Sequence, residues 1–496
     1  MIMKDNELLF EQIQELIKQG PIEEAEKLLI ELRKKGNTAE LNYMISKLLI
    51  NLGRETQNPK RIDESISKLK QLDDKQFPRV HYYLGTAYLK KYEVLEGTLN
   101  IFDSEKLLDN ARLELNNFIS KNPDEDLHNA YVNLGAIYSK LKRTRDSLEI
   151  NEYIINRYKS EYGYFNKGYS LYHYSKYTDN PTSCIKESYR CFKIILEDPN
   201  IKDFFKLKSK NMIDLILEEY PIEFFEEDDD NDELIEIPVD NDFEFYMINY
   251  CWENRLNLNL CDYCQSCFKS TEDSLLIEKM IYTPPEDNNE TSLSKFSSYL
   301  NQIKMDYISA RTLLILSEYE EFDLDSITRN VYLMNTDFDE ERDIRVQFLK
   351  DSFKNFFNIL DKIAVFIKEY LKVEYDDKDI DFKNVWFKPE IKEKLIETDN
   401  SGARALFDIY YELEYDHNKK YLRDTRNALT HRYLKITANK HEITDKTVDE
   451  LKNETFKIAH LIKNAIIYLM RFVKINENMI EKELDIEFTP KKQTII

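Results

Sequence analysis

Glycine is scarce in this sequence and unevenly placed. The chain has nine glycines in 496 residues, and Gly402 is the only one after residue 170. Loops that cradle phosphates and turns that bind dinucleotides need several closely spaced glycines. The scarcity excludes these nucleotide-binding motifs and argues against alternating βαβ folds.

Long apolar runs and numerous cysteines are also missing. No run approaches the roughly 20 apolar residues that a membrane helix needs. The first ten residues include acids and no apolar signal core, so no secretory signal is expected. Six cysteines are too few for a disulfide framework in a chain of this length. We therefore expect a cytoplasmic protein that has no membrane partner.

The composition is that of a globular protein, and the apolar residues recur with a helical period. Apolar residues make up 42% and aromatic residues 12% of the chain. Apolar side chains recur at spacings of three and four, which predicts an all-α fold. The predicted parts are a helical repeat domain (1–222), an acidic linker (223–244), a helical bundle (245–480) and a C-terminal tail (481–496).

The first 222 residues contain a repeated pattern. Leu84-Gly85 with Tyr88 recurs as Leu134-Gly135 with Tyr138, and Gly168 begins a weaker copy. The small residue of each copy would let a neighbouring helix approach closely. The pattern resembles the tetratricopeptide repeat (TPR). An unrelated helical solenoid is the alternative, and either would offer a concave surface for a protein partner.

The predicted linker is strongly acidic. Residues 223–244 contain twelve acids and no lysine or arginine. Such a run usually forms a solvated connection between domains. A cover for a basic patch is the alternative interpretation.

The second half of the chain predicts longer helices. Antiparallel helices of this length form a bundle. A short extended stretch is expected within residues 373–392. The expected helices cover residues 292–320, 341–373, 402–415, 418–436 and 444–475.

One basic segment stands out in a chain whose net charge is −23. Residues 417–441 contain seven lysines and arginines against Asp424 alone, a local charge of +6 that could attract a polyanion. Arg426 is followed by Asn427 and, five positions after the arginine, by His431. Arginine can hold a phosphate by paired hydrogen bonds, and histidine can move a proton near neutral pH. Together they suit cleavage of an RNA phosphodiester without a metal.

Helix geometry limits what one copy of this motif can do. Residues five apart on an ideal helix point about 140° from each other. Arg426 and His431 therefore do not share a face, whereas Asn427 and His431, four apart, do. The motif makes best sense when it is paired with its copy in a dimer.

This motif and several ordered blocks resemble the HEPN superfamily, in particular a bacterial subfamily with N-terminal TPR repeats. The signature is an arginine, a polar residue and a histidine after four to six intervening positions. Thr430 stands where such relatives often have an acid. The resemblance covers roughly residues 240–475, through the blocks Asn254–Leu256, Asn301–Lys304, Ser309–Arg311, Leu360–Ala364 and Arg426–Ile436.

The resemblance implies a metal-independent endoribonuclease that needs no cofactor and acts in phage defence or a toxin–antitoxin pair. His431 would be the general base or acid, Arg426 would stabilise charge on the phosphate, and Asn427 would orient either one. The products would be a 2′,3′-cyclic phosphate and a 5′-hydroxyl. A homodimer through the HEPN domain is implied, and the repeats would bind a protein partner or trigger. Residues expected to bind RNA are Lys419, Lys420, Arg423, Arg432 and Lys435.

Several alternatives stay open. Tyr433 follows the motif as in HEPN toxins silenced by nucleotidylation, but packing is the expected role. Asp361-Lys362 is expected to be an internal polar pair or a packing contact near the motif helix, and His460 a packed core histidine. The whole chain could instead be a non-catalytic RNA- or nucleotide-binding scaffold, or a peptide-binding adaptor. A zinc site is a weaker candidate than free thiols for Cys251, Cys261, Cys264 and Cys267.

Overall fold

The computed structural model describes residues 2–122, 127–176, 181–226, 239–260, 268–276, 291–332, 343–416, 419–437 and 445–483. The chain folds into two compact units. One unit comprises residues 1–173 and 187–218, and the other comprises residues 174–186 and 219–496. Each unit is described by itself below.

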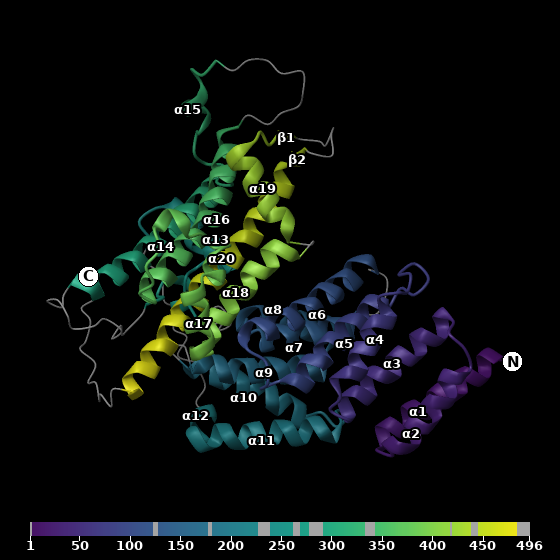
Figure 1. Cartoon of the computed structure of the whole chain (residues 1–496). Helices are drawn as coiled ribbons and strands as arrows, with labels where there is room; N and C mark the ends of the chain where they lie inside the picture. Colours follow the sequence, from purple (N-terminus) through teal and green to yellow (C-terminus); the bar gives the residue numbers. More distant parts are fainter. Residues whose placement is uncertain are drawn as a thin grey trace. The chain divides into compact units, whose positions relative to one another are not determined.

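The N-terminal unit is a series of helical hairpins, drawn from purple to teal in Figure 1. From α1 to α8, consecutive helices pack in pairs, and each pair packs on the next. Residues 2–34 form the first hairpin and residues 39–69 form the second. The helices are α1 (Ile2–Gln19), α2 (Ile22–Lys34), α3 (Ala39–Glu55), α4 (Pro59–Leu69), α5 (Val80–Leu95), α6 (Ile101–Lys121), α7 (His128–Lys140), α8 (Thr144–Tyr158), α9 (Glu161–Ser175), α10 (Pro181–Glu197) and α11 (Asp203–Glu219).

The repeated glycines lie where paired helices come closest. A Cβ atom on Gly85 would lie 2.7 Å from Leu115 of α6, and one on Gly135 would lie 2.9 Å from Asn151 of α8. A Cβ atom on Gly168 would lie 3.0 Å from Phe192 of α10. The predicted close approach at the small residues is therefore confirmed.

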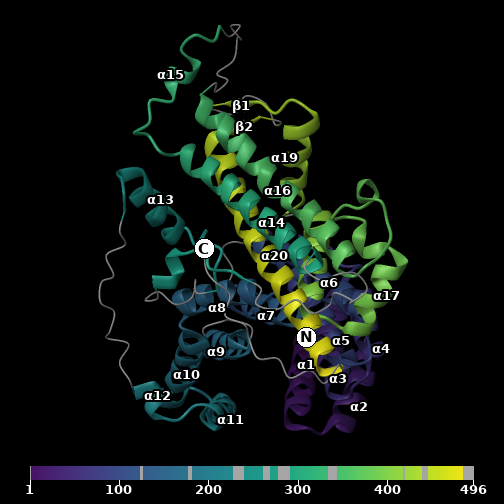
Figure 2. The same cartoon turned by 90° about the vertical axis from the view of Figure 1, so that its left-hand side faces the viewer.

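The C-terminal unit is helical as well, so the all-α prediction is confirmed. Helices α14, α16 and α20 lie side by side (Figure 2), and α18 packs on α20. Helix α19 packs against α16 and α18. The elements are α12 (Glu223–Glu226), α13 (Asp242–Glu253), η1 (Phe268–Thr271), α14 (Thr291–Leu316), α15 (Asp325–Thr328), α16 (Ile344–Tyr370), η2 (Asp377–Asp379), η3 (Val385–Phe387), α17 (Pro389–Thr398), α18 (Ser401–Tyr415), α19 (Lys420–His431), β1 (Ile436–Thr437), β2 (Lys446–Thr447) and α20 (Val448–Glu483).

Gly402 marks the closest approach of α18 to α20. A Cβ atom on Gly402 would lie 2.6 Å from the Tyr468 carbonyl oxygen and 2.6 Å from the Phe472 Cα. Asn400 caps α18 by accepting from the Gly402 N–H, and its amide donates to the Phe472 carbonyl. The only glycine of the second half is thus placed where a side chain would separate two core helices.

A buried arginine joins α14 to the segment that follows α13. Arg311 is 5% exposed and donates two hydrogen bonds, of 2.8 and 2.7 Å, to the carboxylate of Asp273. It also donates to the Leu256 carbonyl at 3.1 Å. Burial opposes ionisation of Asp273. The hydrogen bonds and the charge of Arg311, together with the Leu258 N–H and the charge of Lys304, outweigh it and hold the pKa of Asp273 below its ordinary value. This ion pair is part of the core.

The fourth expected helix of the bundle ends earlier than predicted. It was expected over 418–436, but α19 ends at His431 and the backbone of Arg432 is extended. The chain then forms β1, which pairs in parallel with β2. Ile436 is fully buried in this strand. A continued helix would point its side chain in another direction, so burial of Ile436 favours the strand. The prediction of a helix to residue 436 was therefore wrong.

Residues 373–392, where a short extended stretch was expected, form no strand, although Asp376, Ile380 and Lys388 have extended backbone. This segment forms the short helical turns η2 and η3 and the start of α17. The Asp381 carboxylate accepts hydrogen bonds from the backbone N–H groups of Lys383 and Asn384, which favours a turn over a strand. Pro389 then begins α17 at a position where proline suits a helix.

The domain boundaries stay predictions. The acidic linker begins with α12 and its last residues lie in α13, whereas residues 227–238 lie outside the described residues. The same holds for residues 484–496 of the predicted tail. Within the described parts of the chain, no helix has the length and apolar character required to span a bilayer.

Candidate active site

Helix α19 is fixed to the core by one face and presents another to a pocket. Leu422 and Thr425 are buried, and the Thr425 hydroxyl donates to Glu454 of α20 at 2.8 Å. Lys446 forms an ion pair with the same Glu454. Thr447 and Glu450 exchange hydrogen bonds between side chain and backbone and so cap the start of α20. These contacts set the position of α19, and hence of Arg426.

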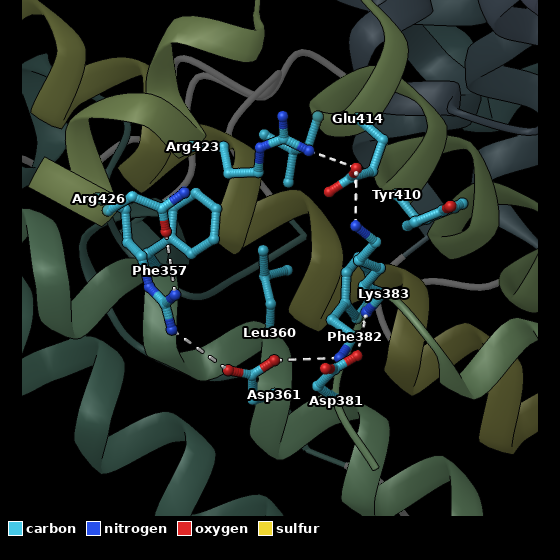
Figure 3. Close-up of a pocket in the computed structure, with 12 residues that line it drawn as sticks. Phe357, Leu360, Asp361, Asp381, Phe382, Lys383, Tyr410, Glu414, Arg423 and Arg426 are labelled. Atoms are coloured by element: carbon cyan, nitrogen blue, oxygen red, sulfur yellow. Dashed lines mark hydrogen bonds and ion pairs between the residues drawn. The ribbon is translucent and has the colours of Figure 1, made fainter. Parts of the chain in front are cut away.

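The pocket lies among α16, the 381–383 turn, α18 and α19, as Figure 3 shows. Its volume is about 400 Å³, within the range of small-ligand pockets. Aromatic and aliphatic side chains form much of its wall, and charged groups of both signs lie among them. The lining residues are Phe357, Leu360, Asp361, Asp381, Phe382, Lys383, Tyr410, Leu413, Glu414, Arg423, Arg426 and Asn427.

Arg426 is held loosely in this pocket. Its Nη2 lies 3.8 Å from the Asp361 Oδ2, which is too long for a hydrogen bond. Its Nη1 lies 3.4 Å from the Asn427 Oδ1, and the guanidinium carbon lies 5.7 Å from the centre of the Phe357 ring. The buried Nε has no hydrogen-bond partner among the described residues. The guanidinium therefore keeps donors that a ligand could use.

The other pocket cations and acids are more firmly paired. Glu414 accepts from Arg423 and lies 3.4 Å from the Lys383 Nζ. The hydrogen bond to Glu414 raises the pKa of Arg423. Asp361 accepts one hydrogen bond, of 3.0 Å, from the Phe382 N–H. Burial raises the pKa of Asp361 above its ordinary value.

His431 does not line the pocket. It is the last residue of α19 and its side chain is exposed. Among the described residues, no hydrogen bond or ion pair involves His431. The structure therefore brings Arg423, Arg426 and Asn427 together and leaves His431 at the helix end, as expected from residues that do not share a face.

The basic segment is less positive in the fold than along the sequence. Four of its seven cations contact acids that lie outside it. Helix α18 supplies two of these acids, because α18 and α19 pack together. The +6 of the sequence thus overstated the local charge. The pairs are Lys419–Glu412, Arg423–Glu414, Arg426–Asp361 and Lys435–Asp445.

Lys420 and Arg432 are the two described cations of this segment with no ion pair among the described residues. Lys420 is half-buried and Arg432 is exposed. Neither lines the pocket. Their proposed contact with RNA stays a prediction, as it does for Lys419 and Lys435.

One expectation about a single side chain was wrong. Tyr433 was expected to pack but is 73% exposed, because it follows the end of α19.

Asp361-Lys362 was expected to be an internal polar pair or a packing contact near the motif helix. Asp361 lies beside Arg426 of α19, which confirms the contact near the motif helix. Lys362 pairs with Asp306 of α14.

The remaining candidates have structural surroundings. Cys251 is a buried free thiol, and burial raises its pKa to about 11. Cys261, Cys264 and Cys267 lie outside the described residues, so the zinc hypothesis stays a weak prediction. The His460 Nε2 lies 2.8 Å from the Asn254 carbonyl oxygen, in keeping with a packed histidine.

Sequence reasoning missed most of the pocket. Glu414, Asp381, Lys383 and the aromatic wall were not singled out, because they are distant from Arg426 along the chain. Asp361 was noted only as part of a polar pair. A signal was available in the spacing of Arg423, which lies three residues before Arg426 and four before Asn427 and is therefore a neighbour of both on the surface of α19.

Comparison with known proteins bears on the larger part of this unit. Residues 288–476 match the model of a family described as LA2681-like HEPN. The C-terminal half of the chain contains an LA2681-like HEPN domain. The matched segment of the HEPN domain includes α14 to α19, most of α20, and both Arg426 and His431.

The match has clear limits. It begins at residue 288, whereas the resemblance was expected from about residue 240. It does not include the N-terminal hairpins, whose assignment as TPR repeats stays a prediction. The comparisons with curated proteins and with solved structures found no significant match.

Proposed function

We propose that the HEPN domain is a metal-independent endoribonuclease. The observation that supports this best is the state of Arg426. Its guanidinium is half-buried, makes no hydrogen bond to Asp361 and keeps an unpartnered Nε. Arginine in that state can donate two hydrogen bonds to a phosphate. An exposed His431 on the same short helix supplies the proton chemistry.

The reaction balances with these groups alone. The ribose 2′-oxygen forms a bond to phosphorus while the bond from phosphorus to the 5′-oxygen breaks. One histidine takes the 2′-hydroxyl proton, and a second donates a proton to the leaving 5′-oxygen. Arg426 stabilises the charge on the phosphate oxygens. The products are a 2′,3′-cyclic phosphate and a 5′-hydroxyl.

A second copy of the chain would complete the site. His431 lies outside the pocket that contains Arg426, so one α19 does not place both groups around one phosphate. Two α19 helices meeting in a homodimer would supply two arginines and two histidines. The exposed His431, Arg432 and Tyr433 at the end of α19 are accessible to such a partner.

The N-terminal hairpins have a separate role in this proposal. Stacked hairpins of this kind present an extended surface that suits protein ligands. We assign them the binding of a protein partner or trigger that controls the nuclease. Phage defence or a toxin–antitoxin pair would be the setting in which such control matters.

One observation favours a second function. The pocket contains Arg423, Arg426 and Asn427 but not His431, which is the arrangement of a binding site without its proton-transfer group. The domain would then bind RNA or a nucleotide without cleaving it, and the chain would be a scaffold.

Purified full-length protein distinguishes the two functions. We expect it to cleave RNA in EDTA, with His431→Ala and Arg426→Ala each reducing the rate at least about 100-fold, the range of a lost acid–base group. Thr430→Ala, which alters an exposed neighbour of His431, is the matched control and should cleave normally. RNA binding without products, unchanged by His431→Ala, would favour the scaffold instead.

A further inference from the structure

We infer that the pocket beside Arg426 binds a single nucleobase, and that it selects guanine. The inference rests on the proposed RNA substrate, because it assigns the base next to the phosphate that is cleaved. Three properties of the pocket support it, namely the wall, the charge, and the carboxylate of Asp361 next to the guanidinium of Arg426.

The wall of the pocket suits a flat heterocycle. Phe357, Phe382 and Tyr410 contribute aromatic rings, and Leu360 and Leu413 contribute aliphatic surface. Figure 3 shows Phe357, Leu360 and Phe382 bordering the same space. Proteins bind unpaired bases by stacking them on aromatic rings or on arginine guanidinium groups. The guanidinium of Arg426 over Phe357 extends that stacking surface.

The charge of the pocket argues against a phosphate inside it. Three cations and three acids line the space, so its formal charge is zero. A phosphate placed within it would face three carboxylates. An uncharged ligand with its own donors and acceptors fits better. Arg426, at the side where α19 borders the pocket, can still reach a phosphate attached to a bound base.

Each of the three carboxylates keeps one oxygen that accepts no hydrogen bond from the described residues. Asp381 uses Oδ1 for both N–H groups of its own turn, at 2.9 and 2.8 Å, and Arg423 and Lys383 both contact the Oε2 of Glu414. Asp361 uses Oδ1 for the Phe382 N–H, and its Oδ2 lies 3.8 Å from Arg426. Asp361 differs from Glu414 in that the neighbouring arginine makes no hydrogen bond to it, so an acceptor and a donor are both available to a ligand there.

A carboxylate acceptor favours bases that present N–H donors. Guanine has two adjacent donors, N1–H and the N2 amino group, beside the acceptor O6. Adenine and cytosine offer an amino group alone on that edge, and uracil presents a carbonyl on each side of its single N–H. Asp361 beside Arg426 provides an acceptor next to a donor, which is the complement of guanine.

Binding of nucleosides to the full-length His431→Ala chain tests this without any cleavage. By calorimetry or ligand-observed NMR, we expect guanosine to bind at least about tenfold more tightly than uridine. Asp361→Asn should weaken guanosine at least about tenfold, since it replaces a charged acceptor. Asp351→Asn, an exposed carboxylate on the same helix paired with Lys354, should have no effect. Tripolyphosphate should not compete.

The outcomes separate this inference from the proposed function. Equal binding of guanosine and uridine, no nucleoside binding, or displacement by tripolyphosphate would overturn the base pocket even if the parent cleaves RNA. Selective guanosine binding in a chain that never cleaves RNA would overturn the nuclease and leave the pocket standing. The preference for guanosine over uridine is measured on a chain that keeps Asp361. That comparison therefore tests the inference even if the Asp361→Asn chain does not fold.

Discussion

The guanidinium of Arg426 lies 3.8 Å from the carboxylate of Asp361, near enough for attraction and too far for a hydrogen bond. Asp361 is fixed by the Phe382 N–H, and Arg426 lies over Phe357. The arginine is thus held in position while some of its N–H donors make no hydrogen bond. Substrate can take up its donors with little loss of existing hydrogen bonding, which suits a group that stabilises a developing charge.

The shared active site predicts complementation between two inactive chains. We expect Arg426→Ala and His431→Ala chains, each inactive alone, to recover part of the cleavage activity when they are co-expressed. A mixed dimer contains an arginine from one chain and a histidine from the other. Differently tagged chains allow mixed dimers to be purified and assayed. Mixed dimers that form but do not cleave would contradict the shared site.

The environment of Asp361 predicts that removing its charge does not destabilise the fold. Burial raises the pKa of Asp361, so the native chain binds this proton more readily than the unfolded chain. The ionised carboxylate therefore opposes folding at neutral pH, and this opposition fades as the pH falls toward the raised pKa. We expect Asp361→Asn to melt at or above the parental temperature at pH 7 and to lose any advantage in acid. A Tm about 3 °C or more below the parent at pH 7 would contradict this, with Asp351→Asn as the control.

The close contact at Gly402 predicts that adding a single methyl group there greatly lowers the stability of the fold. Gly402→Ala places a Cβ atom 2.6 Å from the backbone of α20, so α18 must move away. We expect the free energy of unfolding to fall by about 3 kcal/mol, at the upper end for overpacking. Ser401→Ala, one residue earlier, removes a hydroxyl with no partner among the described residues and should change little. Chemical denaturation measures both.

The pair of buried Arg311 with half-buried Asp273 predicts a different stability effect. Asp273→Asn leaves the Arg311 charge in the core without its partner, which should cost about 3 kcal/mol. Asp323→Asn breaks an exposed Asp–Arg pair with Arg329 and should cost under about 1 kcal/mol. Denaturant titration of both variants compares the same chemistry in two environments.

The pH dependence of that pair follows from the depressed pKa of Asp273. The native state binds this proton less readily than the unfolded chain, so the contribution is complete above the ordinary aspartate pKa of about 3.9. It is lost as the pH falls below that value through the native pKa. The parent and Asp273→Asn should therefore differ at pH 7 and converge in strong acid. A difference that persisted undiminished in strong acid would contradict the assignment.

The sequence predicted the helices and the motif because both depend on local spacing. The three-to-four periodicity located α14, α16, α18 and α20 to within a few residues in most cases. The end of α19 was missed because Ile436 is buried by contacts that local spacing does not specify. Two features of the site could not be predicted, namely the reduced charge of the basic segment and the place of the Asp361 carboxylate beside Arg426. Both depend on residues that the fold brings together from separate helices.

The central claim is that Arg426 and His431 cut RNA without a metal. The most direct measurement is transcriptome-wide sequencing of 5′-hydroxyl RNA ends after brief induction of the parent or of His431→Ala. We predict new 5′-hydroxyl ends in the parent at defined sites, a bias for guanine beside the cut, and loss of these ends in His431→Ala. The same ends at the same abundance in both samples would contradict the claim.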